Sequence, residues 1–315
     1  MKSKNWLMRF FCAPTRLKMT KINKCKLFAN SDSIMLSEFF YTFAAVILTI
    51  NAFMKKLLVM AMAFCAVNVM AQTDKTCLSV TYEVEYLRYA EDNYMSKDVA
   101  RLDIGEYASR YYSLVHEWYK AHNDGKSPYS GTTCRREDVF KNMPDKGHLT
   151  FIHMPFWITT DDTIPGLFNW QLEDGDSVIC SYPCKRATVD FRGRKWSVWY
   201  SLDLPYSDGP WKFCGLPGLI LSAEDSSNQF SIHCIGIEKG DGHAICYPSG
   251  RRNKVVSPER LEELLILEAE DEPAYHSMML PGGGKITMND KNGRPIVWEA
   301  KTAVTFERFI NNRKK

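Results

Sequence analysis

The sequence predicts a mainly β protein with a single antiparallel, curved sheet or half-barrel and one or two helices; a β-sandwich is the alternative. Three observations support this fold class. Apolar and polar residues alternate with the two-residue period of a strand in 78–88, 98–112 and 184–202. Turn-forming residues separate these stretches. Helical spacing occurs at 114–118 and in a stretch that begins at Ser257, and such a helix would cover the apolar face of the sheet.

The first part of the chain is expected to form a strand, a hairpin and a short helix. The strand covers 78–88, and its apolar face consists of Val80, Tyr82, Val84 and Tyr86. The hairpin joins 98–104 to 106–112, and the helix follows at Leu114. Residues 123–147 are rich in Gly, Ser, Pro and charge, which predicts a long surface loop.

Regular structure is expected to resume after this loop. Residues 149–158 predict a strand that is broken at Pro155. Asp161 and Asp162 predict a turn with two solvated carboxylates. A calcium site is disfavoured there, because no oxygen donors follow at a fixed spacing.

The predicted C-terminal helix has clear boundary signals. Ser257 is its N-cap and Pro258 occupies its first turn, while Pro273 is expected to end it. Beyond the helix, 286–288 and 296–306 predict two more strands. These elements complete a single domain over 72–315.

The most sharply defined prediction is a hairpin in the middle of the chain. Its strands, 184–191 and 194–202, both alternate, and the loop Arg192-Gly193 suits a type I′ turn because glycine accepts a positive φ. This register makes both faces consistent. It pairs Val189 with Trp196, Ala187 with Val198, Asp190 with Lys195, and Arg186 with Trp199.

A bend rich in glycine and proline follows the hairpin. Pro217 lacks an N–H, so the segment does not fit inside a regular ladder. One interpretation is a bend that contacts a ligand; the other, which we favour, is a packed corner where a side chain would not fit. The motif residues that would contact a ligand are Trp211, Lys212, Gly215, Leu216, Pro217, Gly218, Leu219 and Ile220.

Several motifs in 169–225 occur together in one bacterial family. They are Ile179-Cys180-Ser181-Tyr182-Pro183-Cys184-Lys185-Arg186-Ala187-Thr188 after a Trp, Phe191–Arg194, Trp199-Tyr200, Gly209-Pro210-Trp211-Lys212-Phe213, and the hexapeptide Gly215–Ile220. The chain resembles the GLPGLI family, which is named after that hexapeptide. The resemblance implies a secreted or periplasmic protein of Bacteroidetes-type bacteria. The family has no established activity, so the resemblance implies no site residues.

Residues 54–71 have the form of a secretory signal peptide. A short basic start at Met54 is followed by an apolar run and by small residues, which predicts cleavage between Ala71 and Gln72. A signal peptide begins a chain, so we interpret 1–53 as an upstream mis-start or a disordered extension.

The rival interpretation of the N-terminal region is a membrane anchor at 39–53. Its 15 residues fall short of the roughly 20 that a spanning helix needs. We therefore expect a mature chain that does not span the membrane and is periplasmic or secreted.

The charge of the mature chain disfavours a nucleic-acid partner. The whole sequence has a formal net charge of +3. Residues 1–71 hold ten of the 40 Lys and Arg and two of the 37 Asp and Glu, which leaves 30 basic and 35 acidic residues and a net charge of −5. An acidic chain without a basic run has no electrostatic basis for binding nucleic acid.

Seven cysteines follow Gln72, and export would place them where disulfides persist. The odd number leaves at least one unpaired. The candidates for disulfides are Cys180, Cys184, Cys214 and Cys234. A metal site is not expected, because the Cys-x8-His-x2-Cys spacing from Cys234 fits no zinc pattern. No cofactor is expected either, since Gly282–Lys285 lacks the hydroxyl and the earlier glycine of a phosphate loop.

The sequence contains neither a Gly-x-Ser-x-Gly nor a His-Glu-x-x-His motif. A catalytic site assembled in space leaves no fixed spacing, so enzymatic activity stays open, although we lean against it. Three functions are compatible with these observations. We favour a non-enzymatic cell-envelope protein that binds a ligand or partner in the concavity of the sheet. The alternatives are a periplasmic hydrolase and a structural or assembly partner of an outer-membrane system.

Overall fold

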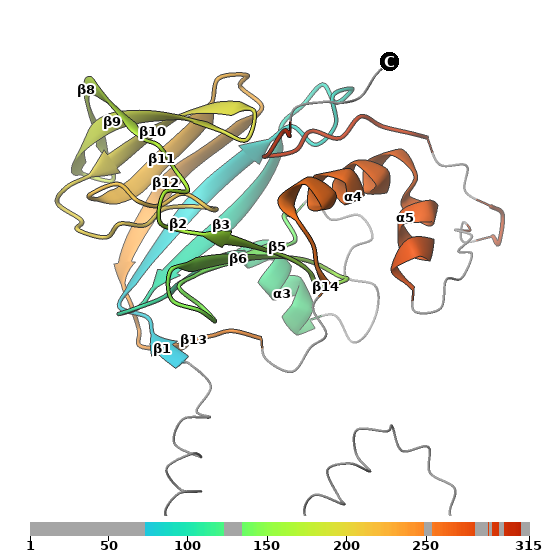
Figure 1. Ribbon diagram of the computed structural model, residues 1–315, viewed down its shortest axis with the longest axis horizontal. Coiled ribbons are helices and arrows are strands. Elements are labelled where there is room, and N and C mark those ends of the chain that lie inside the picture. Colours follow the sequence, from blue (N-terminus) through green and yellow to red (C-terminus); the bar gives the residue numbers. More distant parts are fainter. Residues whose placement is uncertain are drawn as a thin grey trace, which may run out of the picture. The chain divides into compact units, whose positions relative to one another are not determined.

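The computed structural model describes residues 73–122, 134–248, 254–280, 289, 292–295 and 299–309 (Figure 1). The predictions for 1–53 and 54–71, with cleavage between Ala71 and Gln72, lie outside the described residues. The strand predicted at 286–288 does so as well. Within the part of the chain that is described, no helix has the length and hydropathy needed to cross a membrane.

One large sheet dominates the described structure, which confirms a mainly β fold. Its order is β14-β7-β6-β5-β4-β3-β2-β12-β11-β10-β9-β8, and all neighbours are antiparallel except β14 and β7. The sheet is open, because β14 and β8 each pair on one side. β1 and β13 form a separate two-stranded sheet.

The bounds of the elements are as follows. The strands are β1 (Thr73–Lys75), β2 (Leu78–Tyr86), β3 (Ser96–Ile104), β4 (Ser109–Ser113), β5 (Glu137–Lys141), β6 (His148–His153), β7 (Ile158–Thr163), β8 (Gln171–Ile179), β9 (Tyr182–Phe191), β10 (Arg194–Ser201), β11 (Leu219–Asp225), β12 (Phe230–Lys239), β13 (Ala244–Cys246) and β14 (Lys254–Val255). The helices are α3 (Leu114–His122), α4 (Pro258–Glu270) and α5 (Glu272–Met279).

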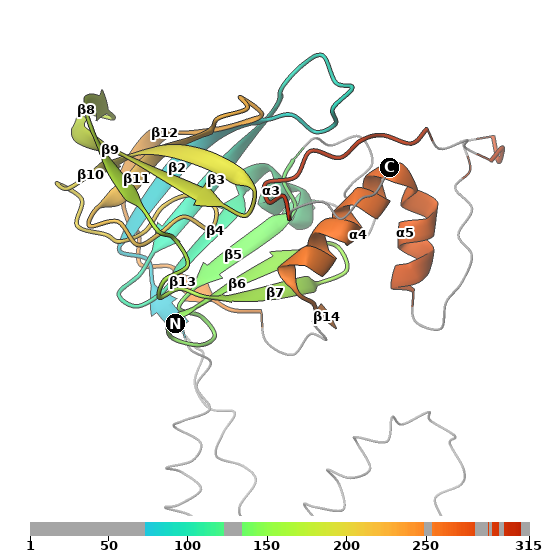
Figure 2. The ribbon, with the colours of Figure 1, turned by 45° about the horizontal axis from the view of Figure 1, so that its top comes forward.

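The main core lies against one face of the large sheet. The predicted apolar face of β2 is buried throughout: Val80, Tyr82, Val84 and Tyr86. Residues from α4, from the bend after β10 and from the C-terminal segment belong to the same apolar cluster, including Leu261, Leu264, Phe213, Leu216 and Phe306. The strand direction changes progressively along the sheet, and α4 lies beside β5, β6 and β7 (Figure 2). A helix thus covers the face that strand alternation left apolar.

The central hairpin has the predicted turn and register. Arg192 and Gly193 have φ values of 45° and 74°, as a type I′ turn requires. The paired residues are Val189 and Trp196, Ala187 and Val198, Asp190 and Lys195, and Arg186 and Trp199. Local sequence alone was sufficient here, because the turn and both faces specify the same register.

The hairpin of β3 and β4 also forms, but β4 begins at Ser109 and not at residue 106. The intervening turn is held by Asp74, whose carboxylate accepts hydrogen bonds from the backbone N–H groups of Tyr107 (2.6 Å) and Ala108 (2.8 Å). Gly105 is required in this turn, because a Cβ there would lie 2.3 Å from the Asp74 carboxylate. A contact from β1 therefore shortens the predicted strand.

Part of the predicted surface loop at 123–147 is a strand. Residues 123–133 lie outside the described residues, but β5 occupies a central place in the sheet and is buried along its whole length. The sequence did not predict this strand because two of its charged residues, Asp138 and Lys141, find their partners in distant segments. Asp138 accepts a hydrogen bond from Arg110 (2.7 Å), and Lys141 donates one to the carbonyl of Gly209 (2.6 Å).

The prediction of a turn at Asp161 and Asp162 is wrong. Both residues belong to β7, which pairs with β6. Asp162 is buried and contacts the cations of Arg192 and Lys212. A charged pair predicts a turn only where solvent supplies its hydrogen bonds, and here distant residues supply them.

The C-terminal helix begins as predicted, but its end differs. The Ser257 side chain accepts a hydrogen bond from Arg260 N–H (3.3 Å). Pro273 does not end α4; it lies in the first turn of α5, which Asp271 caps. The strand predicted at 296–306 does not form in the described residues 299–306, where Ala303 makes only an isolated bridge to Tyr89.

Candidate functional site

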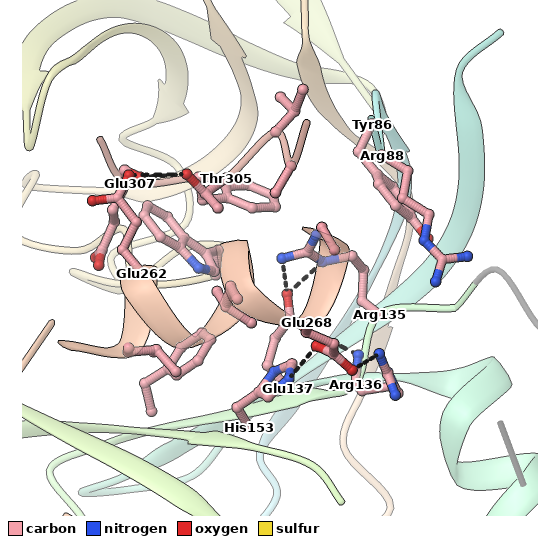
Figure 3. A pocket seen from close by; sticks show the side chains of 18 of the residues that line it. Tyr86, Arg88, Arg135, Arg136, Glu137, His153, Glu262, Glu268, Thr305 and Glu307 are labelled. Carbon is pink, nitrogen blue, oxygen red and sulfur yellow. Dashed lines mark hydrogen bonds and ion pairs between the residues drawn. The ribbon is translucent and has the colours of Figure 1, made fainter. Parts of the chain in front are cut away.

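A cavity of about 180 Å³ lies between the large sheet, α4 and the C-terminal segment 303–307 (Figure 3). Segments far apart in the sequence form its wall. These are the end of β2, residues 134–137, the end of β6 and the first residues of the bend after β10. The enclosure therefore exists only in the folded chain.

The floor of the cavity is aromatic. Trp211 and Phe306 stack with their ring centroids 4.9 Å apart, and Phe306 also stacks on Trp196 at 5.8 Å. Phe230 lies 4.0 Å from Phe306. Such clusters bury large areas and prefer offset or tilted contacts. Phe306 thereby fixes the C-terminal segment against the sheet.

Arg135 covers this aromatic floor on one side. Its guanidinium carbon lies 4.5 Å from the ring centroid of Phe306 and 5.1 Å from that of Tyr86. The same guanidinium forms an ion pair with Glu137, which is buried in β5. The arginine is thus held by two rings and a carboxylate, a geometry that suits a planar cation.

A second ion-pair cluster lines the wall. Arg136 donates a hydrogen bond to Glu268 of α4 (2.8 Å), and His153 Nε2 lies 3.5 Å from the other carboxylate oxygen. Figure 3 shows both side chains directed at Glu268. Burial opposes ionisation of Glu268, but the hydrogen bond with His153 and the charge of Arg136 outweigh it and lower its pKa to about 2. Glu268 is therefore a fixed anion and not a proton donor.

A buried network of four charges joins the bend to the C-terminal segment. Lys212 lies 2.7 Å from Glu307 and 3.1 Å from Asp162, and Arg192 contacts both carboxylates. Burial would raise the pKa of Asp162, but the charges of Lys212 and Arg192 lower it. Each buried charge thus has an opposite partner, as burial of ions demands.

The Trp211 indole N–H and the Cys134 thiol are polar groups on the wall that belong to none of these ion-pair clusters. Trp211 is 2% exposed, and its Nε1 has no hydrogen-bond partner within the described residues. Cys134 contributes a thiol, and burial raises its pKa to about 11. At neutral pH the cavity therefore contains an unused N–H donor and a protonated thiol, which is a weak nucleophile.

The predicted motif residues divide between the cavity and the core. Trp211 and Lys212 line the cavity. The apolar side chains of the hexapeptide pack inside the protein, where Leu216, Leu219 and Ile220 are almost fully buried, whereas Gly215 and Pro217 are exposed. A Cβ on Gly218 would lie 2.0 Å from the carbonyl oxygen of Ser201, so the chain passes too close for a side chain. Gly215 has a φ of 94°, and Pro217 separates the two glycines.

The structure brings three of the four candidate disulfide cysteines together. Cys180 Sγ lies 3.5 Å from Cys234 Sγ. Burial raises the pKa of Cys184, and the nearby Cys180 thiol raises it further. Cys214 lies elsewhere, beside Lys141 and Asp208. None of the described cysteines is joined in a disulfide.

The two histidines in the sequence segment from residue 233 to Cys246 have partners of their own. His233 contacts Ser222 Oγ (2.9 Å) and Glu224 (3.1 Å). His243 contacts Asp103 and Asp241. Across the described ranges, no group of three or more His, Cys, Asp or Glu side chains is arranged to hold a metal ion.

His243 also forms an arrangement that superficially resembles a hydrolase site. Its Nε2 lies 3.1 Å from Thr76 Oγ1, and its Nδ1 contacts Asp241. However, Nε2 also lies 3.1 Å from Asp103. Burial opposes ionisation of Asp103, yet hydrogen bonds from Ser79 and others lower its pKa, so it accepts a hydrogen from Nε2. A nitrogen that donates to a carboxylate cannot accept the threonine proton.

Sequence reasoning missed most of the cavity. Arg135 and Arg136 fall within the predicted surface loop at 123–147, and Phe306 was placed in a strand. Glu268 lies on α4 among other acidic residues. The available signal was the spacing of Leu261 and Glu268, seven residues apart on one helix face, which predicts that the carboxylate follows the apolar stripe toward the core.

Comparison with solved structures finds proteins of low structural and sequence similarity. Two crystal forms of PNGF-II align with TM-scores of 0.42 and 0.41 at 13% and 12% identity, covering 61% and 60% of this chain. The chain spans about a third of the length of PNGF-II, 32% in each case. MucB in complex with MucA(peri) aligns with a TM-score of 0.25 at 11% identity, over 55% of this chain and 52% of that one.

Comparison with curated proteins returns no match. Comparison with protein families returns a match over residues 192–222, which covers the hairpin turn, β10, the bend and the start of β11. Over this segment the chain is similar to the family described as "Protein of unknown function (Porph_ging)".

Proposed function

We propose that the protein is a non-enzymatic, exported GLPGLI-type binding protein of the cell envelope, and that its ligand is a small, uncharged amphipathic molecule. The ligand would occupy the cavity between α4, β6 and the C-terminal segment 303–307. Its apolar part would lie on the aromatic floor, and a hydrogen-bond acceptor would face Trp211 Nε1.

The unpartnered indole N–H of Trp211 carries this proposal. A buried donor without a partner costs about 1–3 kcal/mol, and a ligand that accepts its hydrogen bond removes that cost. Trp211 is 2% exposed and lines the cavity, and three cations of the same wall, Arg135, Arg136 and Lys212, already have carboxylate partners. An acceptor on the ligand is therefore the missing part of this site.

The paired charges support an uncharged ligand. Arg135 pairs with Glu137, Arg136 with Glu268, and Lys212 with Glu307. A charged ligand would have to compete with a fixed partner at each of these positions, and an uncharged one would not.

The size of the cavity supports a compact ligand. Pockets for drug-sized molecules are typically about 300–1,000 Å³, and this cavity is smaller at about 180 Å³. A single ring or a short acyl chain with one carbonyl or ether oxygen suits both the volume and the lining.

Native mass spectrometry of the protein purified from its own cells tests the proposal. We expect a bound small molecule that is released on denaturation. Leu265→Trp should abolish its retention by filling the cavity, whereas Val178→Trp, at a position that is 70% exposed, should retain it. Retention by a folded Leu265→Trp protein, or no bound molecule in the wild type, would contradict the proposal.

Affinity for the recovered molecule provides a second test. Trp211→Phe keeps an aromatic ring and removes the donor, so we expect affinity to fall roughly five- to tenfold, the effect of about one hydrogen bond. Trp118→Phe is the matched control, because Trp118 is 56% exposed and lies outside the cavity. Equal affinities of the two variants would show that Trp211 Nε1 does not donate a hydrogen bond to the ligand.

The two alternative functions have less support. A hydrolase that forms a covalent intermediate through Cys134 would need its thiolate, and burial keeps this thiol protonated by raising its pKa to about 11. An assembly partner would need a contiguous apolar patch. The exposed large apolar residues, such as Leu172, Ile235 and Met278, are spread over separate elements.

A further inference from the structure

Cys180 and Cys234 bring two thiols into contact across the large sheet. Their Sγ atoms lie 3.5 Å apart, although 54 residues separate them in the sequence. Cys180 Sγ also lies 3.3 Å from the carbonyl oxygen of Cys234. The two thiols are therefore in contact, although Cys234 Sγ also lies 3.7 Å from the carbonyl oxygen of Gly236.

The contact joins strands that are not neighbours. Cys180 lies in the turn between β8 and β9, at one edge of the sheet, and Cys234 lies in β12. β11 and β10 separate β12 from β9 in the sheet order. The hairpin tip must therefore reach across two strands to meet β12, so a bond here would hold a part of the fold that ladder hydrogen bonds do not.

The backbone at both positions suits a crosslink. Cys180 and Ser181 form the two-residue turn with φ values of 50° and 71°, a conformation that favours glycine or asparagine. A cysteine in this conformation costs backbone energy, which a bond to its side chain would offset. The ladder of β12 is irregular between Cys234 and Gly236, which leaves room for adjustment.

We propose that Cys180 and Cys234 form a disulfide that fastens the β8–β9 turn onto β12. Cys180 is exposed and meets the oxidant first, whereas Cys234 is buried at 7% exposure and completes the bond. The oxidant is a disulfide, R′–S–S–R′. The Cys180 thiolate attacks one of its sulfurs and releases R′–S⁻; the Cys234 thiolate then attacks Cys180 Sγ and releases the second R′–S⁻. Two cysteine thiols are oxidised, one disulfide is reduced, and the two cysteine protons end on the released thiols.

Peptide mapping after treatment of the purified protein with oxidised glutathione tests the proposal. We expect one crosslinked peptide that contains Cys180 and Cys234 and that is lost on reduction with dithiothreitol. We also expect oxidation to raise the melting temperature by on the order of 5 to 10 °C, because the bond closes a long loop. Cys180→Ser should remove both the crosslink and the response of the melting temperature to oxidation.

Two matched variants sharpen the test. Cys184→Ala removes the third, buried thiol of the group and should leave the crosslink between the other two intact. Cys246→Ser removes another exposed thiol and should also have no effect. A crosslink from Cys180 to Cys184, or free thiols at both Cys180 and Cys234 after oxidation of the folded wild type, would overturn the proposal.

Discussion

Lys212 and Glu307 form a buried ion pair, with Lys212 Nζ 2.7 Å from Glu307 Oε1, although 95 residues separate them. Their side chains are 1% and 9% exposed. Lys212 lies just before the hexapeptide Gly215–Ile220, and Glu307 lies in the C-terminal segment. The pair therefore connects the central motif to the segment that closes the cavity.

We expect Lys212→Met to destabilise the fold by about 3–5 kcal/mol, because it leaves two buried carboxylates with one cation in place of two. Urea denaturation followed by circular dichroism measures the loss. Lys185→Met is the matched control, since Lys185 forms an exposed ion pair with Asp176, and its midpoint should not move measurably. Similar midpoints for the two variants would show that the buried network contributes nothing.

Glu268→Gln should flatten the dependence of stability on pH. The pKa of Glu268 is lowered from 4.5 to about 2 in the folded protein, so its ionised form stabilises the fold above pH 4.5. That contribution, about 3 kcal/mol, is lost as the pH falls toward 2. Between pH 5 and 2, the free energy of unfolding of the wild type should fall by about 3 kcal/mol more than that of the variant.

The comparison between wild type and Glu268→Gln removes the contribution of other carboxyls. Asp98 titrates in the same region, because burial raises its pKa to about 6. Because its pKa is raised, protonation of Asp98 increases the free energy of unfolding as the pH falls, and this effect is the same in the wild type and in Glu268→Gln. Glu263→Gln, on the exposed face of α4, is the control and should follow the wild-type curve. Parallel curves for wild type and Glu268→Gln would contradict the assigned pKa.

Gly218→Ala should destabilise the protein by about 3 kcal/mol, because its Cβ would lie 2.0 Å from the backbone carbonyl oxygen of Ser201. Gly236→Ala is the matched control: nothing lies within 4 Å of a Cβ there, so the substitution should be close to neutral. Thermal unfolding of the two variants distinguishes them. If Gly218→Ala were as stable as Gly236→Ala, the bend would have to shift away from β10 at little cost to make room for the added Cβ.

Phe306→Ala should cost about 3–5 kcal/mol, because the ring contacts Trp196, Trp211 and Phe230 and is 6% exposed. The loss should appear in the urea midpoint and in faster proteolysis of the C-terminal segment. Tyr107→Ala removes an aromatic ring that is 70% exposed and should leave both unchanged. Unchanged proteolysis of Phe306→Ala would show that other contacts hold the segment.

The central hairpin shows how much the sequence alone could predict. Its register follows from Arg192-Gly193 and from alternation on both faces, and all of that information lies within about twenty residues. The apolar face of β2 and the N-cap of α4 at Ser257 are local in the same sense. The structure of such elements is specified by residues that lie close together in the sequence.

The cavity could not be predicted in this way, because its polar residues acquire their environment from distant segments. From the sequence, Asp162 was predicted to be a solvated turn residue, but in the structure it is buried and pairs with Arg192 and Lys212. Arg135 was predicted to lie in a surface loop, but in the structure its guanidinium packs against the rings of Phe306 and Tyr86.

By itself, the sequence determined the mainly β class, the central hairpin with its register, and the start of the last long helix. Only the tertiary structure decided which charges are buried, where the cavity lies, and that Cys180 meets Cys234. The physical reason is the sequence distance over which each effect acts. Turn geometry, helix capping and side-chain alternation are set by residues that are close in the sequence, whereas desolvation and charge pairing depend on which distant residues the fold brings into contact.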